Sequence, residues 1–177
     1  EFFAEFYLDD LWVNKEKHIV TEKVDELDIF KVIRDKRLVI IQGNAGSGKS
    51  TILKYIAYKR AEEMIHSRLD TIDLLPVYLP LNDWASNKGN FMDSVKCYYQ
   101  ESGMNEYFFN YLEKLIEDGK CLILLDALDE VKSKKFLDNN MKQFTNGLGN
   151  NCKCIVTTRF GYEHELTNWE NYKLMDF

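Results

Sequence analysis

Residues 38–50 read Leu-Val-Ile-Ile-Gln-Gly-Asn-Ala-Gly-Ser-Gly-Lys-Ser, an apolar run followed by a glycine-rich turn, a lysine and a serine. The apolar run predicts a buried strand, and the helical spacing of the apolar residues after Lys49 predicts a helix. A glycine-rich turn between a strand and a helix lets backbone N–H groups point at a polyphosphate, because no Cβ blocks its approach. The helix N-terminus adds partial positive charge. This segment therefore predicts a phosphate-binding loop and, with it, a nucleotide site.

The residues of this loop have distinct expected roles. Nine consecutive residues are expected to surround the nucleotide phosphates: Gly43, Asn44, Ala45, Gly46, Ser47, Gly48, Lys49, Ser50 and Thr51. In this motif the lysine, Lys49, reaches the β- and γ-phosphates and the hydroxyl of Ser50 binds Mg²⁺. Thr51 is expected to add a phosphate contact. The plainer alternative is a glycine-rich loop that only turns the chain.

Composition narrows the class of protein. The chain has 177 residues, of which 45% are hydrophobic and 29% charged, as in a single globular domain. It has 23 Lys and Arg against 29 Asp and Glu, a formal net charge of −6. An acidic chain lacks the electrostatic footprint of a duplex-binding domain, so no direct contact with nucleic acid is expected.

Cysteine spacing and hydropathy indicate in which cellular compartment the protein lies. The 4 cysteines form no Cys-x-x-Cys pair, which predicts reduced thiols and a cytoplasmic protein. No apolar stretch approaches the length of about 20 residues that spans a bilayer, and no secretory leader is visible. The chain begins at Glu1 without an initiator methionine, which indicates a piece of a longer protein.

Periodicity along the chain predicts an α/β fold. Strands are expected at residues 38–42, 74–81, 121–125, 154–158 and 172–175, and helices at 49–67, 91–101, 105–118 and 134–147. This alternation predicts a three-layer sandwich with a parallel central sheet covered on both faces. Residues 1–30 are expected to be a lead-in segment that packs on the core formed by residues 31–177. A partner-docking helix is the alternative for this segment.

A second segment, which is acidic, completes the expected site. Residues 121–126 read Cys-Leu-Ile-Leu-Leu-Asp, a buried strand with a carboxylate at its tip, which is typical of a Walker B motif. Asp126 is expected to hold Mg²⁺ through water, because this ion prefers oxygen ligands and keeps part of its hydration shell. Asp129 and Glu130 follow, and either could polarise an attacking water. The alternative is that both acidic residues only solvate a loop.

A third predicted strand is followed directly by an arginine. Residues 154–159 read Cys-Ile-Val-Thr-Thr-Arg, so Arg159 is expected at the same edge of the sheet as the phosphate-binding loop and Asp126. Its rigid fork of donors matches phosphate oxygens, which makes it a candidate γ-phosphate sensor. An ordinary surface arginine at a strand end is the alternative.

Together these segments resemble the NACHT family. The resemblance lies in residues 43–51, in residues 126–130 with a small residue directly after the aspartate, in residues 157–159, and in the strands at 75–81 and 172–177. NACHT domains belong to the STAND group of signalling P-loop ATPases, whose core is similar to that of AAA+ ATPases. The helical lid and winged-helix domains that follow in the family are absent from this chain.

The resemblance implies a switch that binds ATP or ADP with Mg²⁺. It implies exchange of ADP for ATP, self-association into a ring, and sensor and effector domains outside these residues. Bacterial members often serve in antiviral defence and animal relatives in innate immunity. By position, the resemblance implies that Lys49, Ser50 and Thr51 bind phosphate and Mg²⁺ and that Asp126 coordinates Mg²⁺. It likewise implies that residues 129–130 support hydrolysis and that Arg159 is the sensor.

Other functions stay open on the sequence. A nucleotide-binding scaffold that does not hydrolyse, and a small-molecule P-loop kinase, share the same loop; the kinase is disfavoured because no arginine-rich lid is visible. Residues 87–90 read Asn-Lys-Gly-Asn rather than the Asn-Lys-x-Asp that reads guanine, so adenine is favoured. Backbone groups near residues 18–21 are candidates for contact with the adenine.

Overall fold

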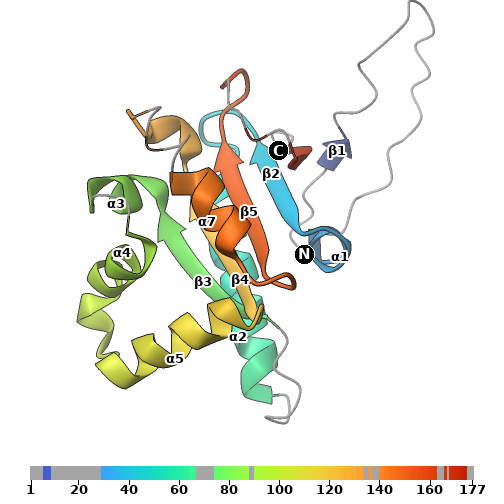
Figure 1. Ribbon diagram of the computed structural model, residues 1–177. Coiled ribbons are helices and arrows are strands. Elements are labelled where there is room, and N and C mark those ends of the chain that lie inside the picture. Colours follow the sequence, from blue (N-terminus) through green and yellow to red (C-terminus); the bar gives the residue numbers. More distant parts are fainter. Residues whose placement is uncertain are drawn as a thin grey trace, which may run out of the picture.

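The computed structural model describes residues 6–8, 29–66, 74–87, 90–133, 136, 140–162, 166 and 168–174. In this part of the chain one 6-stranded sheet has the order β1-β6-β2-β5-β4-β3, and helices lie on both of its faces (Figure 1). The strands are β1 (Phe6–Leu8), β2 (Leu38–Gln42), β3 (Leu75–Pro80), β4 (Cys121–Asp126), β5 (Lys153–Thr158) and β6 (Glu170–Leu174). This arrangement of helices on both faces of one sheet confirms the expected α/β class.

All the strands from β2 to β6 run parallel, which brings their carboxyl ends to one edge of the sheet. β2 lies between β5 and β6, and its last residue, Gln42, pairs in register with Thr158. Asp126 ends β4 and pairs with Pro80 of β3. The segments that follow β2, β4 and β5 therefore meet at the same edge, which is where ligands bind in open parallel sheets.

The helices connect these strands, and two of them differ from the expectation. The described helices are α1 (Ile29–Asp35), α2 (Lys49–His66), α3 (Leu81–Ser86), α4 (Phe91–Tyr98), α5 (Glu106–Glu117) and α7 (Lys142–Gly147), with 3-10 turns η2 (Gln100–Ser102) and η3 (Leu128–Glu130). The helix predicted for 91–101 is wrong at its end, because α4 stops at Tyr98 and a separate turn follows. α3 was not predicted, since its 6 residues are too few to show a period.

Side-chain caps explain where α4 and α5 begin. The side chain of Asn90 accepts a hydrogen bond from the backbone N–H of Asp93, and that of Asn105 accepts one from Phe108, both at 3.1 Å. Each bond satisfies a backbone donor that the first helical turn leaves unpaired. Periodicity alone had placed these two starts at residues 91 and 105, within one residue of the observed ones.

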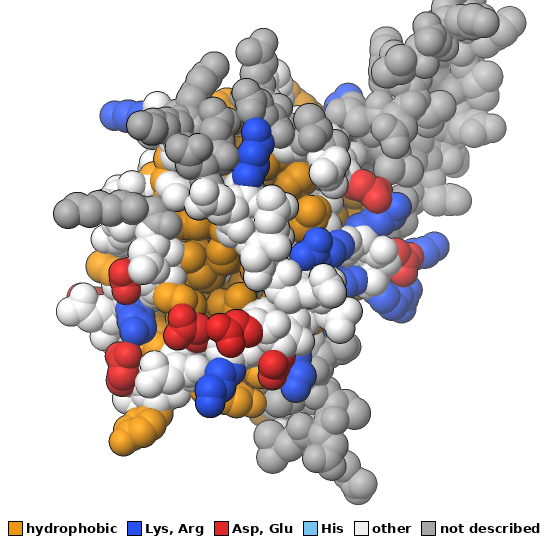
Figure 2. Space-filling model, in the orientation of Figure 1, with side chains coloured by type: hydrophobic (Ala, Val, Ile, Leu, Met, Phe, Trp, Pro, Cys, Tyr) orange, Lys and Arg blue, Asp and Glu red, His pale blue; other side chains and the backbone are white. Residues whose placement is uncertain are grey.

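The sheet separates two hydrophobic clusters. α1 and α2 cover one face, where Leu53 and Ile56 of α2 are fully buried. α3, α4, α5 and α7 lie with the cluster on the other face, where Trp84 packs against the rings of Phe91 and Phe144 with centroids 5.1 and 4.9 Å away. In Figure 2 hydrophobic side chains show at the centre of the molecule and charged side chains surround them. Burial from both sides explains why β4 carries a continuous apolar run.

The lead-in segment is described at residues 6–8 and 29–30 only. β1 pairs antiparallel with β6 and forms the edge of the sheet, which the apolar pattern of this segment did not predict. The residues expected near the adenine, 18–21, lie outside the described residues. The division into residues 1–30 and 31–177 stays a prediction.

The cysteines are all free thiols, and Cys121, Cys152 and Cys154 are buried while Cys97 is exposed. Among the helices that the structure describes, none combines the length and hydropathy of a membrane span.

Candidate functional site

The loop between β2 and α2 has the backbone that its glycines predict. Gly46 and Gly48 have φ values of 81° and 89°, a left-handed conformation that side chains disfavour. Gly43 has a different reason to be glycine, since a Cβ there would lie 2.5 Å from the hydroxyl oxygen of Ser47. That hydroxyl is buried and has no hydrogen-bond partner within the described chain. The loop is thus a tight cradle with a polar group on its inner side.

Lys49 lies across this loop. Its Nζ donates hydrogen bonds to the carbonyl oxygens of Gly43 and Asn44, at 2.8 and 2.6 Å. The loop is also attached to β5, because the N–H of Gly43 donates to the carbonyl of Thr158 at 3.2 Å. Positive charge therefore lies in the cradle, beside the N-terminus of α2, which is the electrostatic arrangement that phosphate groups prefer.

Asp126 lies at the tip of β4, the strand between β3 and β5, and is only 6% exposed. Its two carboxylate oxygens accept hydrogen bonds from two neighbouring strands: Tyr78 of β3 donates to Oδ2 at 2.9 Å, and Thr157 of β5 donates to Oδ1 at 2.5 Å. Thr157 Oγ1 in turn accepts from the N–H of Ala127 at 2.9 Å. The carboxylate is therefore oriented from both sides.

Ala127, directly after Asp126, has a φ of 62°. It is the one residue other than glycine with positive φ in the described chain. A bulky or β-branched side chain would be strained in this conformation. The small residue after Asp126 thus suits the backbone turn that leads from β4 into η3.

The environment of Tyr78 keeps its hydroxyl protonated. Burial, and after it the hydrogen bond to the Asp126 carboxylate, raise the pKa of Tyr78 well above its ordinary value. Burial disfavours the phenolate, and so does a neighbouring negative charge. Tyr78 therefore acts as the donor in its contact with Asp126.

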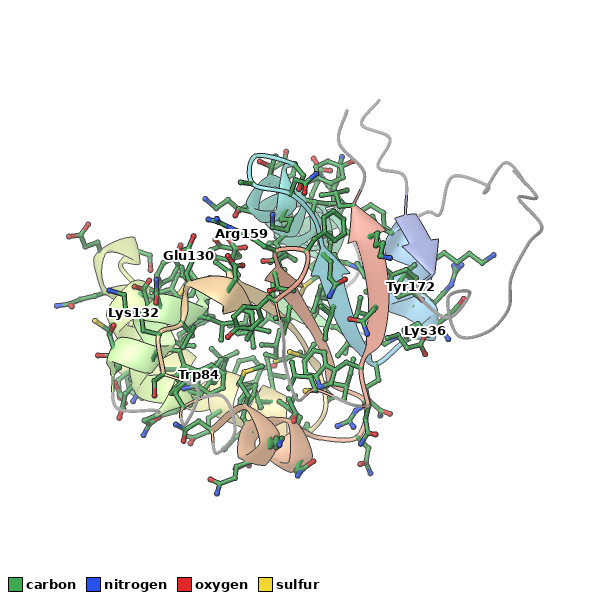
Figure 3. All side chains as sticks on the ribbon, turned by 90° about the horizontal axis from the view of Figure 1, so that it is seen from above. Lys36, Trp84, Glu130, Lys132, Arg159 and Tyr172 are labelled. Carbon is green, nitrogen blue, oxygen red and sulfur yellow. The ribbon has the colours of Figure 1, made fainter. Side chains whose placement is uncertain are left out.

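Arg159 and Asp129 form an ion pair at the tips of β5 and β4. Arg159 Nε lies 2.8 Å from Asp129 Oδ2, and the backbone N–H of Arg159 donates to Oδ1 at 3.1 Å. The Asp129 side chain is 11% exposed and that of Arg159 is 57% exposed. Seen from above, Arg159 and Glu130 lie near each other, while Lys36 and Tyr172 lie toward the edge of the sheet that β6 and β1 form (Figure 3). Both carboxylate oxygens of Asp129 thus contact Arg159.

Glu130 has a different environment. Its side chain is exposed, and Asn82 Nδ2 lies 3.5 Å from its Oε2. That distance is at the weak end of hydrogen bonding. The structure therefore separates two acidic residues that sequence reasoning treated alike: Asp129 is paired with an arginine, and Glu130 faces solvent.

These residues fit a nucleotide with Mg²⁺. The hydroxyl of Ser50, at the start of α2, and the carboxylate of Asp126 are hard oxygen donors of the kind that Mg²⁺ prefers. Mg²⁺ usually takes one or two protein ligands and completes its shell with phosphates and water. No cluster of three or more His, Cys, Asp or Glu side chains that could hold a metal ion occurs among the described residues.

Four side-chain contacts of the site were not predicted: those of Tyr78 and Thr157 with Asp126, that of Asn82 with Glu130, and the ion pair of Arg159 with Asp129. Tyr78 and Thr157 lie within strands, where aromatic and β-branched residues are common for packing alone. One feature of the sequence could have indicated these contacts: Tyr78 and Thr157 each place a hydroxyl near the carboxyl end of a strand that neighbours β4. That signal is weak without the strand order.

Comparison with known proteins agrees with the resemblance. Residues 37–168 match the family model of the NACHT domain. A search of curated proteins gives no match. Among solved structures, that of C. elegans PCH-2 matches with a TM-score of 0.49 and 18% identity, over 82% of this chain and 37% of that chain. This chain therefore spans well under half the length of that structure.

Proposed function

Because the chain belongs to the NACHT family, we propose that it is the Mg²⁺-dependent, ATP-binding and slowly hydrolysing switch domain of a larger protein. Nucleotide binding by a P-loop NTPase domain is the general part of this function. The hydrolysis, the change of state between ADP and ATP, and the identity of the site residues are the specific parts of the proposal.

The arrangement of Arg159 is the observation that carries the proposal. An exposed guanidinium is held by Asp129 at the tip of β5, the strand to which the phosphate-binding loop is hydrogen-bonded. A donor that reaches the γ-phosphate lets the domain distinguish ATP from ADP. Lys49, Ser50 and Thr51 would bind the phosphates, and Ser50 and Asp126 would hold Mg²⁺.

Family membership supports the wider role. We propose that nucleotide exchange controls self-association of the complete protein, with sensor and effector domains outside these residues. Innate immunity or antiviral defence in the cytoplasm is the proposed setting. No direct contact with nucleic acid is proposed.

The proposal is tested by titrating the purified chain with ATP, ADP and GTP in the presence of Mg²⁺. ATP and ADP are expected to raise the melting temperature, and ATP to be converted to ADP at a low rate in single-turnover measurements. Equal affinity for ATP and GTP would remove the preference for adenine. Absence of any thermal shift would overturn the proposal.

A non-hydrolysing scaffold is the second candidate. It is favoured by one observation, since the Asp129 carboxylate is already paired with the Arg159 guanidinium. Single-turnover hydrolysis above the rate of the buffer alone would exclude this candidate.

Arg159→Ala is expected to weaken the binding of ATP more than that of ADP. Removing the guanidinium deletes a contact that only the γ-phosphate makes, while the loop contacts with the β-phosphate remain. Titration of both nucleotides, followed by thermal shift, measures the two affinities. Arg34→Ala is the matched control, because Arg34 is an exposed arginine in the last turn of α1. Equal loss for ATP and ADP would contradict a sensor role.

A further inference from the structure

We propose that Tyr78 is a positioning residue for the metal site, which orients the Asp126 carboxylate through a hydrogen bond from its phenol. The inference rests on the proposed function, because it concerns the Mg²⁺ that accompanies the nucleotide. It assigns a role to a side chain that lies outside the phosphate-binding loop and outside the acidic segment at residues 126–130.

The sheet places Tyr78 for this contact. Tyr78, Leu124 and Ile155 belong to the cluster on the face that α1 and α2 cover. Because side chains alternate along a strand, Asp126 and Thr157, each two residues further on, point to that same face. In register Asp126 pairs with Pro80, so Tyr78 lies two residues before it on β3. The length of a tyrosine side chain closes this offset, and its hydroxyl reaches Oδ2 at 2.9 Å.

The two hydroxyls act on different oxygens of one carboxylate. Tyr78 donates to Oδ2 from one side, and Thr157 donates to Oδ1 from the other. A carboxylate has about four lone-pair positions, so each oxygen keeps accepting capacity for water or a metal ion. The pair of donors therefore selects one orientation of the Asp126 side chain and leaves its ligand function intact. Partners of metal ligands act in this way in metal sites generally.

Tyr78 is itself held firmly. It is 8% exposed, and its backbone carbonyl accepts a hydrogen bond from the hydroxyl of Tyr99 at 2.9 Å. Its ring lies 6.0 Å from that of Tyr98, and the Lys54 ammonium lies 5.6 Å from its centroid. A donor on a strand, locked by packing on several sides, supports a site more accurately than one on a loop.

A purely structural role for Tyr78 makes a different prediction. Any buried phenol needs a hydrogen-bond partner, and Asp126 could merely satisfy it. In that case removal of the hydroxyl would change the stability of the protein but not its response to Mg²⁺. A positioning role requires the Mg²⁺ response itself to change.

The experiment measures the thermal shift of the whole chain at fixed ADP as Mg²⁺ is titrated. Tyr78→Phe is expected to raise the Mg²⁺ concentration at half-maximal shift by about 10-fold, the lower end of the losses seen when partners of metal ligands are removed. Binding of ADP in EDTA is expected to stay within about twofold of the unsubstituted chain, because the phosphate loop is untouched.

Tyr172→Phe is the matched control. It removes a buried phenol that donates to the carboxylate of Glu170 rather than to that of Asp126, so the Mg²⁺ midpoint is expected not to move. In an Asp126→Asn background, Tyr78→Phe is expected to have no further effect on that midpoint. If Tyr78→Phe does not fold, Thr157→Val removes the opposite donor and is expected to raise the midpoint in the same way.

Two outcomes separate this inference from the proposed function. A Tyr78→Phe protein that titrates with Mg²⁺ as the unsubstituted chain does would overturn the positioning role and leave nucleotide binding standing. An unchanged midpoint in Thr157→Val, where that variant replaces it, would have the same meaning. No response of the unsubstituted chain to ADP, with or without Mg²⁺, would overturn both.

Discussion

Lys49→Ala is expected to abolish the thermal stabilisation of this domain by nucleotide. At a ligand concentration one hundredfold above the dissociation constant, binding stabilises the folded state by about 2.7 kcal/mol. For a domain of this size that corresponds to a rise in melting temperature of roughly 5–11 °C. The Lys49 ammonium lies within the phosphate-binding loop and donates hydrogen bonds to the carbonyl oxygens of Gly43 and Asn44. Without it the rise is expected to disappear, because the phosphates lose their main counter-charge.

The control for this prediction is Lys114→Ala. Lys114 is an exposed lysine in the last turn of α5, which lies at the opposite end of the sheet from the phosphate-binding loop (Figure 1). The same change of charge there is expected to leave the thermal shift unaltered. An unchanged shift with Mg-ATP in Lys49→Ala would contradict the assignment of the loop as a nucleotide site. The melting temperature of the variant without nucleotide shows whether the substitution alone disturbs the fold.

The features that sequence predicted correctly are those with a local cause. The backbone of the loop at residues 43–50 follows from its glycines, two of which have left-handed conformations. The strands from β2 to β5 follow from apolar runs bounded by polar or glycine residues. Helix starts at Phe91 and Glu106 follow from the asparagine caps that precede them. Each of these signals acts within a few residues, so a single sequence contains it.

The features that sequence did not predict depend on tertiary contacts. β1 exists as a strand because β6 offers it an edge, and nothing within residues 6–8 requires that pairing. The contact of Tyr78 with Asp126 spans 48 residues and depends on the order of β3, β4 and β5. Likewise, Asp129 and Glu130 are adjacent acidic residues, and only the position of Arg159 distinguishes them. The residues of the expected site therefore follow from local sequence patterns, and their roles stay a prediction, whereas the contacts that support them depend on the fold.

Glu130→Gln is expected to lower the single-turnover rate of ATP hydrolysis by about 10²–10⁴-fold, the usual contribution of a general base. Of the two acidic residues after Asp126, Glu130 is exposed and lacks an ionic partner among the described residues, so its carboxylate is available to water. Nucleotide affinity is expected to be retained, because the loop and the magnesium ligands are unchanged. Thermal shift with ATP and single-turnover kinetics measure the two quantities separately.

Asp129→Asn provides the decisive comparison with Glu130→Gln. Its carboxylate is held by the side chain and the backbone N–H of Arg159, so its neutralisation is expected to release the arginine and to weaken the discrimination between ATP and ADP, as Arg159→Ala does. Glu113→Gln, at an exposed position of α5, is the control for loss of one negative charge. A loss of hydrolysis in Asp129→Asn with full activity in Glu130→Gln would reverse the two roles. A hydrolysis rate no higher than that of the buffer alone, in the unsubstituted chain and in both variants, would leave the domain a non-hydrolysing scaffold.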